Sequence, residues 1–156
     1  MKRTIVIFLL VMLLSSSLTY AMASSKDKNS SIYKLTDAES LRMLIDRAFA
    51  AIGDAYQSRS LIDMTELLDK DYEDLLDFRS ALESYFLNVK ELQINFVIDT
   101  TLIDKNKVGV RLHWFKKEID NSGAFQKIEG SSQFVFKKSE GELKLLYYRG
   151  DNPFYT

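Results

Sequence analysis

The side chains that could carry acid–base chemistry in this sequence are one histidine and a scattered set of carboxylates. His113 is the only histidine, and its near-neutral pKa makes it the first group to consider as a general base. Because it alternates with Leu112 and Trp114, it should lie opposite the apolar side of its strand, exposed or in an interface. A catalytic carboxylate would need burial that raises its pKa. The acids we considered are Asp46, Asp74, Asp77 and Asp99. None of them falls at a position whose spacing predicts that it faces the core, so we assign no catalytic residue.

Metal and cofactor chemistry find little support in the residue types present. The sequence contains no cysteine, which excludes a thiolate nucleophile, sulfur metal ligands and disulfides. A single histidine without other ligands at suitable spacing argues against a zinc site, so we predict no metal. Neither a glycine-rich phosphate loop nor a G-x-S-x-G nucleophile elbow is present, and we predict no cofactor.

Aromatic residues at inward phases are more suggestive of a binding site. Tyrosine and tryptophan combine apolar area with one polar group, which suits the wall of a pocket for a ring-shaped ligand. Ordinary core packing is the alternative explanation for the same residues. The side chains we nominate as pocket-lining are Tyr72, Tyr85, Trp114 and Tyr147.

The opposite face of the predicted strands carries apolar residues beside polar ones. A solvated sheet face is usually more hydrophilic than this, and contiguous apolar patches tend to mark contacts. We therefore predict a homodimer or protein-partner surface, the alternative being that the third strand and the chain ends cover it within one monomer. Its members are Val97, Arg111, His113, Phe115, Val135, Leu146 and Tyr148.

The helices that position these residues are predicted from hydrophobic spacing. Apolar residues at three- and four-residue steps indicate a long helix that starts at Thr36 and ends near Gln57. Thr36 and Glu39 fit a capping box at its start. Ser60 can cap a second, shorter helix, and a third helix is predicted over residues 78–89.

Beyond residue 90 the hydrophobic period changes from 3.6 to 2, which indicates strands. Strands are predicted over 92–99, 108–115, 124–138 and 143–149, joined by polar turns, with a bulge at Gly130. Helices followed by an antiparallel meander predict an α+β fold with the helices on one face of the sheet.

The first 23 residues have the three parts of a secretory signal peptide. Lys2 and Arg3 precede an apolar run, and Ala21-Met22-Ala23 forms the exit signal. The run of ten residues, Ile5–Leu14, is shorter than the roughly 20 that span a bilayer, although an uncleaved anchor is the alternative. We therefore predict export to the periplasm or beyond, without a stable membrane anchor after cleavage, then a flexible leader over 24–34 and one domain over 35–156.

Charge and composition limit the partners of the mature chain. Cleavage would reduce 21 basic groups to 19 against 22 acidic groups, a net charge near −3. This balance is poor for nucleic-acid binding, which needs clustered lysine and arginine. Hydrophobic residues make up 46% of the sequence, which is enough material for a packed core without disulfides.

The order of elements resembles the nuclear transport factor 2-like superfamily, also called the SnoaL-like or cystatin-like α+β cone. The resemblance covers about Leu35 to Phe154, and its best-matching details are the stretch LLDKDYED and the ending LKLLYYRGDNPF. It implies that the N-terminal helices pack in the concave face of a curved antiparallel sheet of four or more strands. It also implies a cavity open at one end and dimerisation through the outer sheet face.

The fold that this resemblance implies serves isomerases, dehydratases, cyclases, binding modules and assembly domains, so it does not fix the function. We expect an exported, non-catalytic module that binds a small apolar ligand in the cone or a protein partner through the sheet face. One alternative is a cone-pocket enzyme of the isomerase, dehydratase or cyclase type that works by proton transfer. An open cavity in which a carboxylate or a histidine contacts an aromatic hydroxyl would indicate such an enzyme. The other alternative is a structural adaptor of an envelope complex, marked by a filled cone.

Overall fold

The computed structural model of this chain describes residues 37–155. The signal peptide expected over 1–23, the leader over 24–34 and Thr36 of the capping box lie outside the described residues. Contacts divide the chain into two units, and the second, Glu39–Thr156, contains the whole sheet. None of the helices within residues 37–155 combines the length and hydrophobicity needed to cross a bilayer.

Three described helices precede the sheet, and their bounds are α2 Asp37–Gln57, α3 Leu61–Glu66 and α4 Leu75–Asn88. The apolar stripe of α2 is buried at Ile45, Phe49, Ile52 and Tyr56, as its spacing predicted. The Ser60 hydroxyl accepts a hydrogen bond from the Asp63 backbone N–H at 3.2 Å, which confirms the predicted cap of α3. Helix α4 begins three residues earlier than predicted, after Asp74 in the left-handed conformation.

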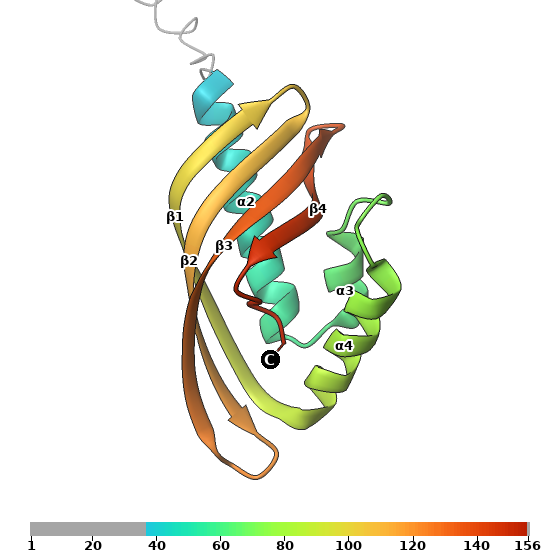
Figure 1. Ribbon diagram of the computed structural model, residues 1–156, viewed down its shortest axis with the longest axis vertical. Coiled ribbons are helices and arrows are strands. Elements are labelled where there is room, and N and C mark those ends of the chain that lie inside the picture. Colours follow the sequence, from blue (N-terminus) through green and yellow to red (C-terminus); the bar gives the residue numbers. More distant parts are fainter. Residues whose placement is uncertain (1–36, 156) are drawn as a thin grey trace, which may run out of the picture. The chain divides into compact units, whose positions relative to one another are not determined.

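Four antiparallel strands follow, with bounds β1 Val89–Asp104, β2 Lys107–Asp120, β3 Phe125–Ser139 and β4 Glu142–Gly150. They lie in the sheet in sequence order. The predicted α+β architecture is therefore confirmed. Figure 1 shows a strongly curved sheet with α2 running along it and with α3 and α4 beside its open side.

Aromatic rings fill much of the space between α2 and the concave face of the sheet. The Phe49 ring of α2 lies 5.1 Å from that of Phe96, 5.3 Å from that of Phe134 and 5.4 Å from that of Phe136, measured between centroids. The inward residues of β2 from Val108 to Trp114 are at most 2% exposed. The period-2 pattern of the sequence thus marks the buried face of this strand.

The bulge predicted at Gly130 is wrong. The register between β2 and β3 runs without interruption through the pair Trp114 and Gly130. A Cβ atom at position 130 would lie 2.5 Å from Trp114 Cζ2 and 2.8 Å from Asp151 Cβ. Glycine is needed here because the tryptophan ring and the chain after β4 both press against the backbone.

The predicted alternation of β4 is wrong after Leu145. Leu145 pairs with Phe136, yet Tyr147 pairs with Val135 and Tyr148 with Phe134, so Leu146 is an extra residue at a bulge. The bulge inverts the phase. Tyr148, expected on the outer face, packs inward with its ring 5.8 Å from that of Phe134. Tyr147, expected in the pocket, lies on the opposite face.

Candidate functional site

Two opposite charges lie inside the concave face of the sheet. Lys116 and Glu118 continue the inward alternation of β2, and their side chains are 0% and 9% exposed. The Lys116 Nζ atom lies 3.2 Å from Glu118 Oε2. Buried charges are costly to desolvate and persist when they are paired and hydrogen-bonded. An ion pair inside a protein core is therefore a candidate functional feature.

Tyr85 of α4 completes what we call the buried polar cluster, which consists of Tyr85, Lys116 and Glu118. The Tyr85 hydroxyl donates to Glu118 Oε2 and accepts from Lys116 Nζ at 3.0 Å. The Nζ atom also lies 4.7 Å from the centroid of the Tyr85 ring, within cation–π range. Tyr56 of α2 stacks on Tyr85 with centroids 6.3 Å apart, so α2, α4 and β2 together build the site.

Burial shifts the protonation equilibria of this site. Desolvation lowers the pKa of Lys116, and the attraction of Glu118 opposes that shift. Desolvation raises the pKa of Tyr85, and its hydrogen bond to Glu118 adds to the shift. Desolvation also raises the pKa of Tyr56, whose hydroxyl donates to the Phe154 carbonyl at 2.8 Å. Both phenols are therefore held in the protonated, donating form.

The raised tyrosine pKa values predict a loss of stability in alkali. Above pH 10 the unfolded chain loses phenolic protons that the folded chain keeps, so the free energy of unfolding must fall as pH rises. Burial raises the pKa of Tyr56, and the variant Tyr56→Phe removes this phenol. Above pH 10 the free energy of unfolding should therefore fall less steeply in the variant than in the wild type, by about 1.4 kcal/mol per pH unit. Urea unfolding at a series of pH values measures both slopes, and parallel slopes would contradict the prediction.

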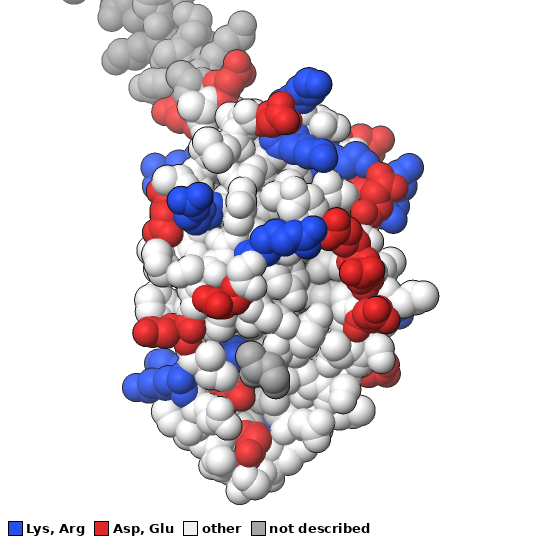
Figure 2. Space-filling model, viewed as in Figure 1, with Lys and Arg blue, Asp and Glu red and all other residues white. Residues whose placement is uncertain are grey.

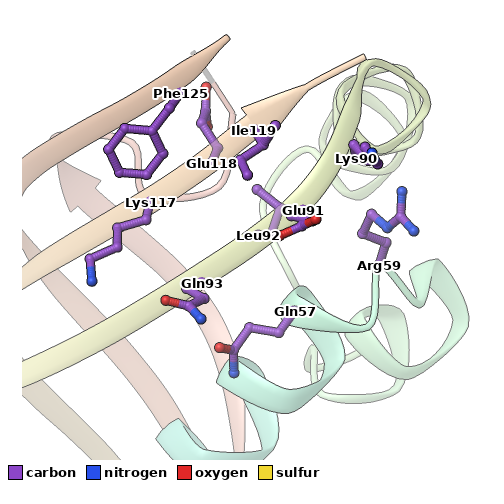
Figure 3. A pocket seen from close by; sticks show the side chains of 10 residues that line it. All are labelled: Gln57, Arg59, Lys90, Glu91, Leu92, Gln93, Lys117, Glu118, Ile119 and Phe125. Atoms are coloured by element: carbon purple, nitrogen blue, oxygen red, sulfur yellow. The ribbon is translucent and has the colours of Figure 1, made fainter. Parts of the chain in front are cut away.

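A cleft of about 410 Å³ lies beside this cluster. It is formed by the C-terminal end of α2, the first residues of β1, the last of β2 and the first of β3. Figure 3 shows the amide groups of Gln57 and Gln93 directed toward one another, with Arg59 near Lys90. The lining also includes the apolar side chains of Leu92, Ile119 and Phe125.

Glu118 is shared by the cleft lining and the buried polar cluster. Its Oε2 atom accepts from Tyr85 and is paired with Lys116. Within residues 37–155 no protein group donates to the other oxygen, Oε1. An ionised carboxylate has about four acceptor positions. The Oε1 atom is therefore an acceptor without a protein donor among the described residues, on a carboxylate that a buried cation holds in place.

The four side chains nominated as pocket-lining do not converge on one pocket. Tyr72 and Trp114 are buried in the core, where the Trp114 Nε1 atom donates to Ser132 Oγ at 3.0 Å. Tyr85 reaches the buried polar cluster, while Tyr147 is stacked by Arg149, with the guanidinium 4.8 Å from its ring centroid. Core packing thus accounts for two of the four, and the structure brings only Tyr85 to the candidate site.

The predicted interface residues are spread between surface and interior. Val97 and Phe115 are 52% and 46% exposed on the outer face. His113 lies there too, with Nδ1 2.8 Å from Asp99 Oδ2, while Val135 is buried at 7% exposure. Leu146 is half-buried, Tyr148 is half-buried and packs against the core, and Arg111 is exposed. In the face that Figure 2 shows, basic and acidic side chains are interspersed.

Lys116 and Glu118 were missed by the sequence reasoning. The signal was present, because both occupy the inward phase already marked by Leu112 and Trp114. Charges of opposite sign two residues apart on an apolar phase predict a buried ion pair. Among the described residues, no group of three or more histidine, cysteine or carboxylate side chains is placed to hold a metal ion.

Comparison by sequence gives no relative, because the chain matches no protein-family profile and no curated protein. Comparison by structure gives many. A conserved protein from Planctomyces limnophilus superimposes with a TM-score of 0.62 at 19% identity, covering 69% of this chain and 91% of that one. A nuclear transport factor 2-like superfamily protein from Salmonella enterica serovar Typhimurium gives 0.60 at 9% identity, with 76% and 95% covered.

A third structure comes from Streptomyces avermitilis and is described as a proposed dehydratase of the same family. It superimposes with a TM-score of 0.60 at 11% identity, covering 70% of this chain and 94% of that one. At these identities the likeness concerns the fold, since one fold carries many functions.

Proposed function

Because the chain has the nuclear transport factor 2-like fold, we propose that it binds a small molecule in the cleft beside Glu118. The single observation that carries this proposal is the position of Glu118. Glu118 is a lining residue of the cleft, and its Oε2 atom is held by Lys116 and Tyr85. A ligand with an N–H or O–H group would donate to Oε1, and its apolar part would contact Phe125 and Ile119.

The lining favours a ligand more polar than the one predicted from the sequence. The cleft contains two glutamines, three basic residues and two glutamates in addition to its apolar residues. Binding sites fix a ligand with a few placed polar groups on an apolar background. Amino alcohols, amines and sugars with a hydrophobic substituent fit this description better than a purely apolar ring system.

A panel of such compounds, screened against the whole mature chain by saturation-transfer NMR, tests the proposal. We expect at least one class to bind, and Glu118→Gln to weaken that binding about tenfold or more, because a hydrogen bond to a charged group contributes about 1.5–3 kcal/mol. Glu83→Gln removes the same charge from the exposed side of α4 and should leave affinity unchanged. Gln93→Ala, at an exposed position of the lining, should weaken binding without disturbing the fold.

Equal affinity in the wild type and in both cleft variants would contradict the proposal, as would a panel without binders. Circular dichroism of each variant separates loss of the site from loss of the fold. Glu118→Gln keeps the shape of the side chain but removes its attraction for Lys116, so the Gln93→Ala result decides the matter if Glu118→Gln is unfolded.

Proton transfer is a second candidate function, favoured by the contact between the Glu118 carboxylate and the Tyr85 hydroxyl. A carboxylate paired with an aromatic hydroxyl can supply a base and an acid for proton transfer, and Glu118 of this pair lines the cleft. The same panel recorded in D2O distinguishes the two functions. An enzyme would exchange a carbon-bound hydrogen of its ligand for deuterium, whereas a binding module would return the ligand unchanged.

A further inference from the structure

The first half of β3 forms an uncovered edge of the sheet. Strand β3 begins at Phe125, but β4 pairs with it only from Ser132 to Ser139. Figure 1 shows the lower part of β3 with β2 on one side and no strand on the other. Edge strands with free backbone groups are templates for pairing with another strand. The segment from Phe125 to Gly130 is therefore a candidate interaction surface, which we call the β3 edge.

The direction of the backbone groups on this edge follows from Ser131. Its N–H donates to Asp151 Oδ2 at 2.9 Å, and its carbonyl accepts from the Asp151 N–H at 3.0 Å. Ser131 thus points its backbone groups away from β2. Because this direction alternates along an antiparallel strand, Lys127 and Glu129 present their N–H and C=O groups to the free edge. Within the described residues no backbone group bonds to them there.

The charges of these two residues point to one occupant. We propose that the β3 edge pairs with the β3 edge of a second copy, antiparallel, about a twofold axis at Ile128. In this register Lys127 lies opposite Glu129 of the second copy, and Glu129 lies opposite its Lys127. Opposite charges at directly paired positions stabilise an antiparallel pair. The same two residues supply the free backbone groups, so charge and hydrogen bonding select the same register.

Neighbouring registers are worse for identifiable reasons. An axis at Lys127 or at Glu129 would place that residue opposite its own copy, and like charges directly opposite destabilise the pair. An axis at Glu129 would also need the backbone groups of Ser131, which already bond to Asp151. An axis between two residues would set edge-facing groups opposite groups that bond to β2.

Pairing at Ile128 joins the four strands of each copy into one continuous sheet. It forms about four backbone hydrogen bonds and two cross-strand ion pairs. The half-buried Ile128 side chains, already packed against the core, meet on the axis at the inner face. The contact is isologous, as a closed dimer requires, and it leaves the outer face with Phe115 free.

Sedimentation equilibrium of the wild type and of charge variants tests the register. We expect a wild-type dimer, and a dissociation constant raised about tenfold or more in Lys127→Glu and in Glu129→Lys, since each sets like charges opposite. The double variant Lys127→Glu with Glu129→Lys restores complementary pairs and should restore the wild-type constant. Both substitutions are at exposed positions, so circular dichroism should report an intact fold in all three variants.

The uncharged change Val97→Ser is the matched control, because Val97 is 52% exposed on the outer face of β1, away from β3, which pairs with β2. It should dimerise like the wild type. A wild type that stays monomeric at its highest attainable concentration would overturn the proposal. So would dimerisation that is unchanged in both single charge variants, or a double variant as weak as the single ones.

Discussion

Replacing Trp114 with alanine is expected to lower the free energy of unfolding by about 3–5 kcal/mol, the range for removal of a buried aromatic side chain. Trp114 is 1% exposed at the centre of β2. Its indole ring covers Gly130, where a Cβ atom would come within 2.5 Å. The cavity left by alanine cannot close easily, because the position opposite offers no side chain. Urea unfolding of the wild type and the variant measures the difference.

Trp114→Phe is the control for this prediction, since it keeps much of the ring volume while losing the Nε1 donor. Ser132 still donates to the Asp151 carbonyl, so phenylalanine leaves no hydroxyl without a partner. We expect this variant to lose about 1–2 kcal/mol. A loss below about 1 kcal/mol for alanine would mean that the ring is not part of the core.

Replacing Lys116 with methionine is expected to destabilise the chain by about 3 kcal/mol. The substitution leaves Glu118 buried at 9% side-chain exposure without its cation. Breaking a buried pair from one side typically costs about 3–5 kcal/mol, and the lower figure applies because Glu118 borders the cleft. Methionine has a similar volume and length, so packing changes little. Thermal and urea unfolding measure the loss.

The double variant Lys116→Met with Glu118→Gln separates charge from packing. Removing both charges is often neutral for stability, so the double variant should recover most of the loss seen in Lys116→Met. The coupling energy from this cycle should lie between about 1 and 3 kcal/mol. Additive losses would show that the two side chains do not interact in the folded chain.

Most of the fold could be predicted from the sequence because each element has its own periodic signal. The stripe from Ile45 to Tyr56 predicted α2, and the change of period near Leu92 predicted the sheet. The bulge at Leu146 could not be predicted in this way. An extra residue inverts the phase of everything after it, so the facing of Tyr147 and Tyr148 depends on pairing with β3, which periodicity does not report.

The candidate site was predicted less completely than the fold. Tyr85 was nominated as pocket-lining and lies in the buried polar cluster, but Lys116 and Glu118 were not considered, although they share the inward phase with Trp114. Sequence patterns are usually interpreted with charges assigned to solvent, because an unpaired buried charge is so costly. What makes these charges tolerable is Tyr85, which is 31 residues from Lys116 in the chain. A partner so distant becomes visible only in three dimensions.

The central claim is that a ligand meets Glu118 in the cleft between α2 and the start of β1. Chemical-shift mapping of the isotope-labelled protein during titration with the strongest binder of the panel tests it most directly. We predict that the largest shifts occur at the side-chain amides of Gln57 and Gln93 and at the carboxylate of Glu118. Shifts centred instead on the outer face around Phe115, with Glu118 unperturbed, would contradict the account.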